Sequence, residues 1–283
     1  GQILQEGINE AGGMASWIAA ATSYSTNNRI MIPFYVYYSM FGFQRIGDLA
    51  WAAGDMQARG FLLGGTSGRT TLNGEGLQHE DGHSHILANT IPNCVSYDPT
   101  FAHEVAVIMH DGLKRMVERQ ENVFYYITLL NENYAMPGLL PGTEEQIIKG
   151  MYLCKPGADG DKRVQLLGSG TILRESLEAQ TLLAADWGVQ ADVWSCPSFN
   201  ELTREGQDAD RWNLLHPLET PRVPFVTRQL GSRSGPVVAS TDYMKAYAEQ
   251  IRPFVPKGRS YRVLGTDGFG RSDFRSKLRE HFE

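Results

Sequence analysis

The chain has 283 residues, which suits one large domain or two of ordinary size. Its 42% hydrophobic and 20% charged residues are typical of a soluble globular protein, and 26 Lys and Arg against 32 Asp and Glu give a formal net charge of −6. This balance argues against a nucleic-acid surface, and no apolar run approaches the length of a membrane span, so we expect neither nucleic-acid nor membrane partners.

Helical and strand patterns alternate through the first half of the sequence. In chain order the pattern predicts a helix over 9–24, a strand over 31–37, a helix over 41–57, a strand over 61–65, a short helix after a polar loop, a strand at 94–96, a helix over 101–118 and a strand over 123–129. Strands separated by helices predict a parallel sheet that is covered on both faces.

The pattern stops and then restarts. Residues 131–142 hold two prolines and two glycines, and 155–162 have the clearest loop composition in the chain. Beyond them the sequence predicts strands at 164–167, 191–195, 236–240 and 261–264 and helices at 173–187, 201–215 and 244–251. We therefore predict an α/β fold of two successive three-layer domains with mostly parallel sheets, at 1–150 and 163–283, joined by a linker at 151–162.

Three cysteines, Cys94, Cys154 and Cys196, are odd in number and widely spaced. They form neither a disulfide framework nor a zinc motif, so we expect small apolar residues near strands and a cytoplasmic protein. The sequence begins at Gly1 without a methionine or a targeting segment, and we expect it to belong to something longer.

Glu10 is the first candidate for a catalytic group. It follows Gly7 at the expected start of an apolar helix, where the helix dipole favours a carboxylate. A first-turn glutamate would explain it without any catalytic role. A role in chemistry needs a partner that the carboxylate can protonate or hold by a short hydrogen bond, so both interpretations stay open.

The segment 69–85 holds three histidines, three carboxylates and three glycines and has neither helical nor strand periodicity, which predicts an ordered functional loop. The spacing of His79, His83 and His85 could supply metal ligands, but Gly82 argues against the continuous helix that would join the first two. We predict no metal site. Acid–base work by one of these histidines beside a cofactor is favoured.

Aromatic residues crowd the end of the first predicted strand, and we expect most of them to be core. They are Phe34, Tyr35, Tyr37, Tyr38, Phe41 and Phe43. A ring that faced a cleft could stack on a planar cofactor, because ligands collect at the carboxyl ends of parallel strands. Gly168-Ser169-Gly170 resembles the start of a phosphate-binding turn but lacks the third glycine, so we expect only a tight strand-to-helix turn.

Several segments together resemble the transketolase superfamily of thiamine diphosphate enzymes, and within it the homodimeric bacterial type of pyruvate dehydrogenase decarboxylating subunit. They are Gln5–Gly12, Phe34–Arg45, Gly74–His79 and Gly265–Asp273, with Arg59–Asn73 and Trp212–Arg222 favouring this member over transketolase itself. The resemblance extends from Gly1 to Glu283. It implies a pyrimidine-binding domain followed by a C-terminal domain of the transketolase type, apparently truncated.

The resemblance also assigns roles by position. Glu10 matches the glutamate that hydrogen-bonds the aminopyrimidine of the cofactor and so activates it. Phe41 matches the aromatic residue against that ring, and Tyr38 lies near the substrate space. His79 matches the histidine near the reacting carbon, where it could orient pyruvate or the acetyl transfer, and Glu75 in the same loop supports that geometry.

The implied activity is the thiamine diphosphate-dependent oxidative decarboxylation of pyruvate, with transfer of the acetyl group to the lipoyl group of a dihydrolipoamide acetyltransferase. The implied assembly is a homodimer that also needs magnesium. The family's magnesium and diphosphate domain, with its Gly-Asp-Gly motif, does not occur in this sequence. We therefore expect the isolated chain to bind the cofactor weakly and to be inactive.

Three alternatives remain. The chain could come from another transketolase-like thiamine diphosphate enzyme, which its acceptors would distinguish. It could be a non-catalytic module that completes a dimer. A nucleotide-binding α/β protein is disfavoured by the missing glycine fingerprint. The resemblance suggests no role for His83 or His85.

Overall fold

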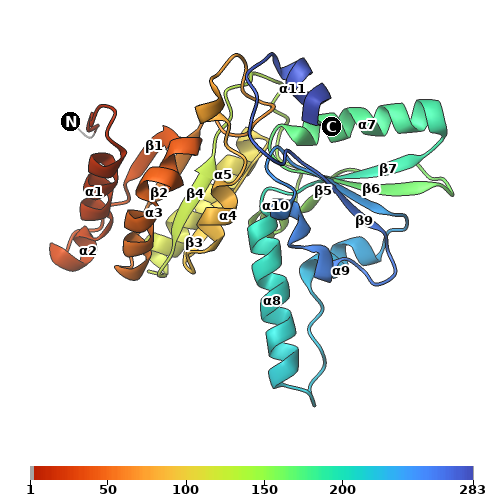
Figure 1. Ribbon diagram of the computed structural model, residues 1–283. Helices are drawn as coiled ribbons and strands as arrows, with labels where there is room; N and C mark the ends of the chain where they lie inside the picture. Colours follow the sequence, from red (N-terminus) through yellow and green to blue (C-terminus); the bar gives the residue numbers. More distant parts are fainter. Residues whose placement is uncertain (1–2, 283) are drawn as a thin grey trace.

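The computed structural model describes residues 3–282, which form two α/β units in sequence (Figure 1). The sheet of the first unit has the order β1-β2-β4-β3, and every neighbouring pair is parallel. Its strands are β1 (Phe34–Tyr38), β2 (Phe61–Gly65), β3 (Cys94–Tyr97) and β4 (Phe124–Thr128). The predicted parallel sheet is confirmed.

Helices cover both faces of this sheet. One face packs on α1 (Glu10–Ala21), α3 (Ser39–Asp55) and α4 (Ser84–Asn89), and the other on α5 (Ala102–Leu113), its π-helical continuation η2 (Lys114–Glu118) and α6 (Glu144–Lys149). Side chains of β4 alternate between the two cores, which is why the strand is buried along its whole length. The first unit therefore has the three layers that the sequence predicts.

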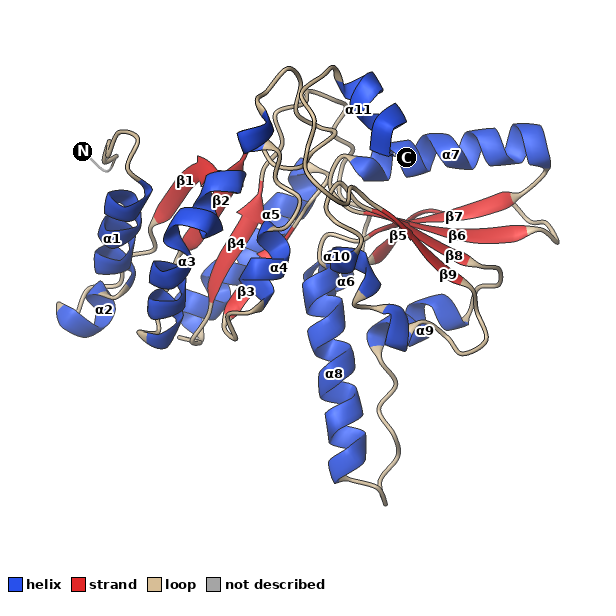
Figure 2. Ribbon diagram, in the orientation of Figure 1, coloured by secondary structure: helices blue, strands red, loops and turns tan. Residues whose placement is uncertain are grey.

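The sheet of the second unit has the order β5-β7-β6-β8-β9 and is parallel except for β5. Its strands are β5 (Tyr152–Lys155), β6 (Arg163–Gly168), β7 (Gln190–Ser195), β8 (Val237–Ser240) and β9 (Tyr261–Leu264). Helix α7 (Ile172–Trp187) covers one face, and α8 (Phe199–Leu215), α9 (Phe225–Gly231) and α10 (Ala246–Glu249) lie at the other (Figure 2). This unit too has three layers.

Four short elements complete the described part of the chain. They are α2 (Ser23–Thr26), the 3-10 helices η1 (Leu77–His79) and η3 (Arg252–Phe254), and α11 (Arg275–Phe282). The turn Gly168-Ser169-Gly170 joins β6 to α7, and a Cβ on Gly168 would come 2.7 Å from Cα of Leu173. The glycine thus serves a close strand-to-helix approach, as predicted. The three cysteines are free.

Residues 151–162, predicted as a linker, are loop only in their second part. Tyr152–Lys155 forms β5, an edge strand that pairs antiparallel with β7. The short helix α6 also precedes it, in a stretch for which no element was predicted. Because α6 still packs on the first unit and β5 belongs to the sheet of the second, the linker prediction is wrong for 152–155.

The expectation that most aromatic residues at the first strand are core is also wrong. Only Tyr37 and Phe43 of the six are buried, whereas Phe34 and Tyr38 are each 52% exposed. The reason is the position of β1 at the edge of its sheet, where alternate side chains have no neighbouring layer. Val36, between those two rings, is 63% exposed.

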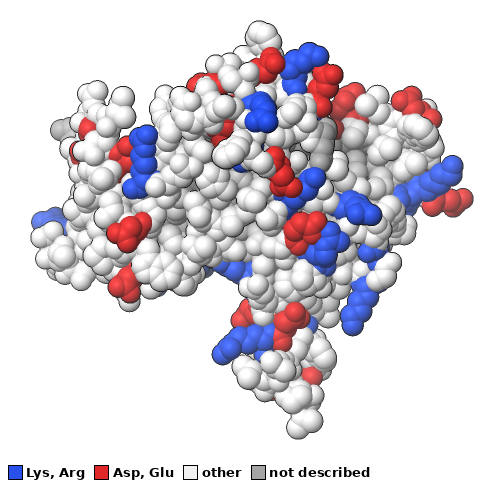
Figure 3. All heavy atoms as spheres, viewed as in Figure 1, with Lys and Arg blue, Asp and Glu red and all other residues white. Residues whose placement is uncertain are grey.

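Helix α8 projects away from its sheet and ends in a long return loop (Figures 1 and 2). The tip is held together by Asn213, which exchanges two hydrogen bonds with the backbone of Arg222, and by the Arg222 guanidinium stacked 4.3 Å from the Trp212 ring. On the face drawn in Figure 3, acidic and basic side chains are interspersed, without a large patch of one sign.

Candidate active site

Glu10 is the first residue of α1, next to the capping residue Asn9, whose side chain accepts a hydrogen bond from the Gly12 amide. A carboxylate at this end of the helix is stabilised by the helix dipole. Its Oε1 also accepts a 2.6 Å hydrogen bond from Arg45 Nη1. The Glu10 side chain is 16% exposed, so the carboxylate is largely enclosed but reachable.

Tyr38, Phe41 and His79 form one ring cluster. The His79 ring lies 5.0 Å from the Tyr38 ring and 5.0 Å from the Phe41 ring, edge to face with both. The two aromatic rings are 6.3 Å apart. His79 Nδ1 is buried and has no hydrogen-bond partner among residues 3–282. Contacts between ring edges and faces orient the imidazole and leave this nitrogen without a hydrogen bond.

The parallel sheet explains why these segments meet. Tyr38 ends β1 and pairs in register with Gly65 at the end of β2, so the segments that follow leave the same edge of the sheet. One of them is α3, which carries Phe41 in its first turn, and the other is the loop that carries His79 in η1. Carboxyl ends of neighbouring parallel strands are the usual place for a ligand.

Arg45 connects Glu10 to the ring cluster. Its guanidinium lies 4.2 Å from the centre of the Phe41 ring while it donates to Glu10. Phe41 and Arg45 are four positions apart on α3, a spacing that puts side chains on the same face of a helix. Sequence reasoning assigned Arg45 no role, although this spacing could have indicated that it lies beside Phe41.

The other predicted residues of the histidine loop lie apart from the ring cluster. Glu75 is partly exposed, and its charge acts on Glu80. His83 lies on the partly exposed side, 3.2 Å from the Gln44 amide nitrogen. His85 is fully buried between the two units, stacked on Tyr247. The three histidines thus lie in three different environments. The described part of the chain has no group of three or more His, Cys, Asp or Glu that could hold a metal ion.

The second unit holds the start of the histidine loop. The buried Asp242 carboxylate, just after β8, accepts hydrogen bonds from the amides of Arg69, Thr70 and Thr71 at 3.0, 2.8 and 3.1 Å. It also accepts from both threonine hydroxyls. The sequence offered no signal for this contact, because the partners are more than 170 positions apart.

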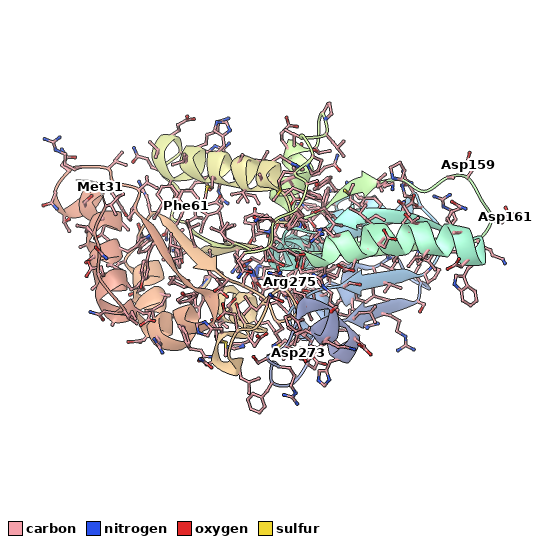
Figure 4. All side chains as sticks on the ribbon, turned by 90° about the horizontal axis from the view of Figure 1, so that it is seen from above. Met31, Phe61, Asp159, Asp161, Asp273 and Arg275 are labelled. Carbon is pink, nitrogen blue, oxygen red and sulfur yellow. The ribbon has the colours of Figure 1, made fainter. Side chains whose placement is uncertain are left out.

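The second unit holds the loop again further along, through Asp273 before α11, Arg275 at its start and Met244 after β8. The Gly74 amide donates to the Asp273 carbonyl, Arg275 Nε donates to the Thr71 carbonyl, and the Met244 amide donates to the Gly82 carbonyl. Figure 4 shows Asp273 and Arg275 between the two units, whereas Asp159 and Asp161 lie at the far end of the second unit. Both units therefore determine the shape of the loop that carries His79.

Three buried titratable groups lie at this junction. Burial raises the pKa of Glu80 to about 8, with the Asp242 carboxylate as a further cause and Arg69 in opposition. Burial also raises the pKa of Asp98 to about 7, although hydrogen bonds from Thr128 and Ser169 favour the charged form. Burial lowers the pKa of His85 to about 4, so its ring is neutral at pH 7.

A separate hollow of about 300 Å³ lies in the second unit, between α7, α11 and the carboxyl ends of β6, β8 and β9. Its lining is mainly apolar and includes Ile172, Ala179, Val238 and Phe282. None of Glu10, Tyr38, Phe41 and His79 lines it, so it is distinct from the ring cluster.

None of the helices formed by residues 3–282 is long and apolar enough to cross a membrane.

Both units of the chain match known protein families. Residues 1–137 match the model of the pyruvate dehydrogenase E1 component middle domain, and residues 150–283 match that of the transketolase-like TK C-terminal domain. The whole chain is 69% identical to the pyruvate dehydrogenase E1 component of Escherichia coli K12 and 66% identical to that of Cupriavidus necator. In both cases it spans 32% of the relative's length.

Solved structures share the fold at low identity. The transketolase of Campylobacter jejuni superimposes with a TM-score of 0.68 at 18% identity, over 99% of this chain and 37% of that one. A structure described as a split gene transketolase, an inactive beta4 tetramer, gives a TM-score of 0.62 at 17% identity, over 98% of this chain and 78% of that one. The chain therefore consists of a segment that matches the E1 middle domain followed by one that matches the transketolase-like C-terminal domain, and over its whole length it is similar to about a third of a pyruvate dehydrogenase E1 component.

Proposed function

We propose that this chain forms the pyrimidine-side wall of the thiamine diphosphate site in an enzyme that oxidatively decarboxylates pyruvate and passes the acetyl group to a lipoyl group. The observation that carries the proposal is the meeting of Tyr38, Phe41 and His79 beside Glu10, from three segments that are separate in the sequence. The identity of 69% with an E1 component supports the same conclusion.

The residues present fit this cofactor. A partly enclosed carboxylate, two aromatic rings and an imidazole with a buried, unpartnered nitrogen are suited to a planar heteroaromatic ligand with ring nitrogens. When bound, thiamine diphosphate would supply the ring that accepts the electrons left by decarboxylation. Glu10 would hold a proton at the pyrimidine ring nitrogen, which requires its carboxylate to be shared with, or released by, Arg45.

The other residues would position and bind. Phe41 would pack against the pyrimidine, and Tyr38 would limit the substrate space. His79 would orient the pyruvate carboxylate or carbonyl and move a proton during acetyl transfer, because a neutral imidazole both donates and accepts. Glu75 is proposed to support the His79 loop from the same segment.

Binding of the diphosphate and of magnesium is proposed to need residues outside this chain, so that the 283-residue polypeptide alone is inactive. The inactive split-gene transketolase structure, which this chain covers to 78%, offers a parallel of the same fold. We further infer a homodimer, because Phe34, Val36 and Tyr38 leave an apolar sheet edge exposed. The proposed partner is the lipoyl-bearing dihydrolipoamide acetyltransferase, and the proposed compartment is the cytoplasm.

The test is Glu10→Gln in the full-length enzyme that contains these two domains. We expect the loss of at least about 100-fold in pyruvate decarboxylation, because the amide cannot hold the proton, with an unchanged circular dichroism spectrum. Glu6→Gln is the matched control, since that exposed carboxylate lies in the same region and accepts a hydrogen bond from Ser16. Normal decarboxylation by the Glu10 variant would overturn the proposal. Transfer to sugar phosphates in place of lipoyl domains would redirect it to a transketolase.

A further inference from the structure

Glu80 directly follows His79 and caps the end of η1. Its side chain is only 1% exposed, and neither carboxyl oxygen has a hydrogen-bond partner within residues 3–282. A buried carboxylate without hydrogen bonds is strongly destabilising, whereas the neutral acid is tolerated at a much lower cost. The proposed function of the site makes no use of this group.

The second unit closes over Glu80. A Cβ on Gly270 would lie 2.1 Å from Cβ of Glu80, so only a glycine permits the segment before α11 to pack this closely. The next residue, Arg271, is directed to the Gly270 carbonyl. Glu80 is therefore enclosed between the histidine loop of the first unit and a glycine of the second.

Charged groups face Glu80 from both units. Asp242 and Glu75 disfavour its ionisation, and Arg69 favours it. The Arg69 guanidinium is already engaged, since it donates to the Thr266 carbonyl and lies where a side chain on Gly82 would be. It is thus fixed in the junction and does not bond Glu80.

We propose that Glu80 is a positioning residue for His79: as a neutral acid it fills the junction between the two units and so holds the imidazole against Tyr38 and Phe41. The inference deepens the proposed function and rests on it for the effect on catalysis. One peptide unit separates the two residues, so an ionised Glu80 that moves toward Arg69 or solvent displaces the His79 ring. Burial and the charge of Asp242 raise the pKa of Glu80 to about 8, which places this change just above physiological pH.

The first test is the pH profile of kcat/KM for pyruvate in the full-length enzyme, between pH 6.5 and 9.5. The wild type should fall about tenfold per pH unit above a break near the pKa of about 8. Glu80→Gln should keep the wild-type value at pH 7 within about threefold and move the break by at least about one pH unit, because the amide stays neutral. Asp98→Asn, another buried acid at the junction, should leave the break in place. An unchanged break in Glu80→Gln would overturn the inference.

The second test is independent of activity. In the 283-residue chain with 13C-labelled histidine, the His79 signal, identified by its loss in His79→Gln, should show an inflection at the Glu80 pKa of about 8. This inflection should be absent from Glu80→Gln. A wild-type signal without it would contradict the role of Glu80 even if that variant failed to fold. If the inflection is present but the full-length enzyme does not act on pyruvate, the proposed function fails and the coupling stands.

Discussion

Arg45 Nη1 lies 2.6 Å from Glu10 Oε1, and the same guanidinium stacks 4.2 Å from the Phe41 ring. One side chain thus joins the carboxylate expected to activate the cofactor with the ring expected to pack against it. The pair directs the Glu10 carboxylate toward the cluster. A ligand that uses the Glu10 carboxylate has to share it with Arg45 or displace it.

Arg45→Ala tests how much the Arg45–Glu10 ion pair contributes to the stability of the fold. The Arg45 side chain is 47% exposed, so water screens the ion pair, and we expect the free energy of unfolding to fall by less than about 1 kcal/mol. Urea denaturation of the 283-residue chain measures it. Arg45→Lys should not restore the small loss fully, because an ammonium lacks the planar face that stacks on Phe41. A loss of several kcal/mol would show that Arg45 has a larger structural role.

Phe41→Ala should weaken cofactor binding in the full-length enzyme by roughly 10- to 100-fold, because the ring both packs on the ligand and supports His79. Tyr38→Phe is the control, since it keeps the ring at 5.0 Å from His79 and removes only the hydroxyl. The dissociation constant for thiamine diphosphate gives the answer. Equal binding by wild type and Phe41→Ala would exclude Phe41 from the site.

Asp242→Ala should detach the histidine loop from the second unit. The variant leaves three backbone amides and two hydroxyls without their acceptor in a buried place, so we expect a loss of roughly 2–5 kcal/mol in thermal or urea unfolding. Asp267→Ala, which removes an exposed carboxylate that accepts one amide, should cost less than about 1 kcal/mol. Similar losses for the two variants would contradict this account of the loop.

The buried Asp98 should make the free energy of unfolding depend on pH. Burial raises its pKa to about 7 from the ordinary value of 3.8, so the unfolded chain releases this proton first and stability falls as pH rises from about 4 to about 7. Asp98→Asn removes that dependence. At pH 8 the variant should be more stable than wild type by at most about 4 kcal/mol, with no gain at pH 4. Thermal unfolding of both proteins between pH 4 and pH 8 measures the difference in stability. The assignment would be refuted if the variant lost stability relative to wild type as the pH rises.

Local pattern was enough to predict both sheets and the candidates Glu10, Phe41 and His79, because strand periodicity and sequence motifs are local. Prediction from local pattern failed where the structure depends on contacts between residues far apart in the sequence. The exposure of Phe34 and Tyr38 depends on the edge position of β1, and β5 is a four-residue strand that only its pairing with β7 defines. Asp242 and Glu80 acquire their surroundings from the other unit, which no spacing in the sequence reveals.

The central claim is that this chain supplies one wall of a shared cofactor site. The most direct measurement is a calorimetric titration of the 283-residue chain with thiamine diphosphate and magnesium, repeated in the presence of the separately produced amino-terminal domain of the same enzyme type. We predict weak or no binding by the chain alone and tight binding by the mixture, abolished by Phe41→Ala. Tight binding by the chain alone, or none in the mixture, would contradict it.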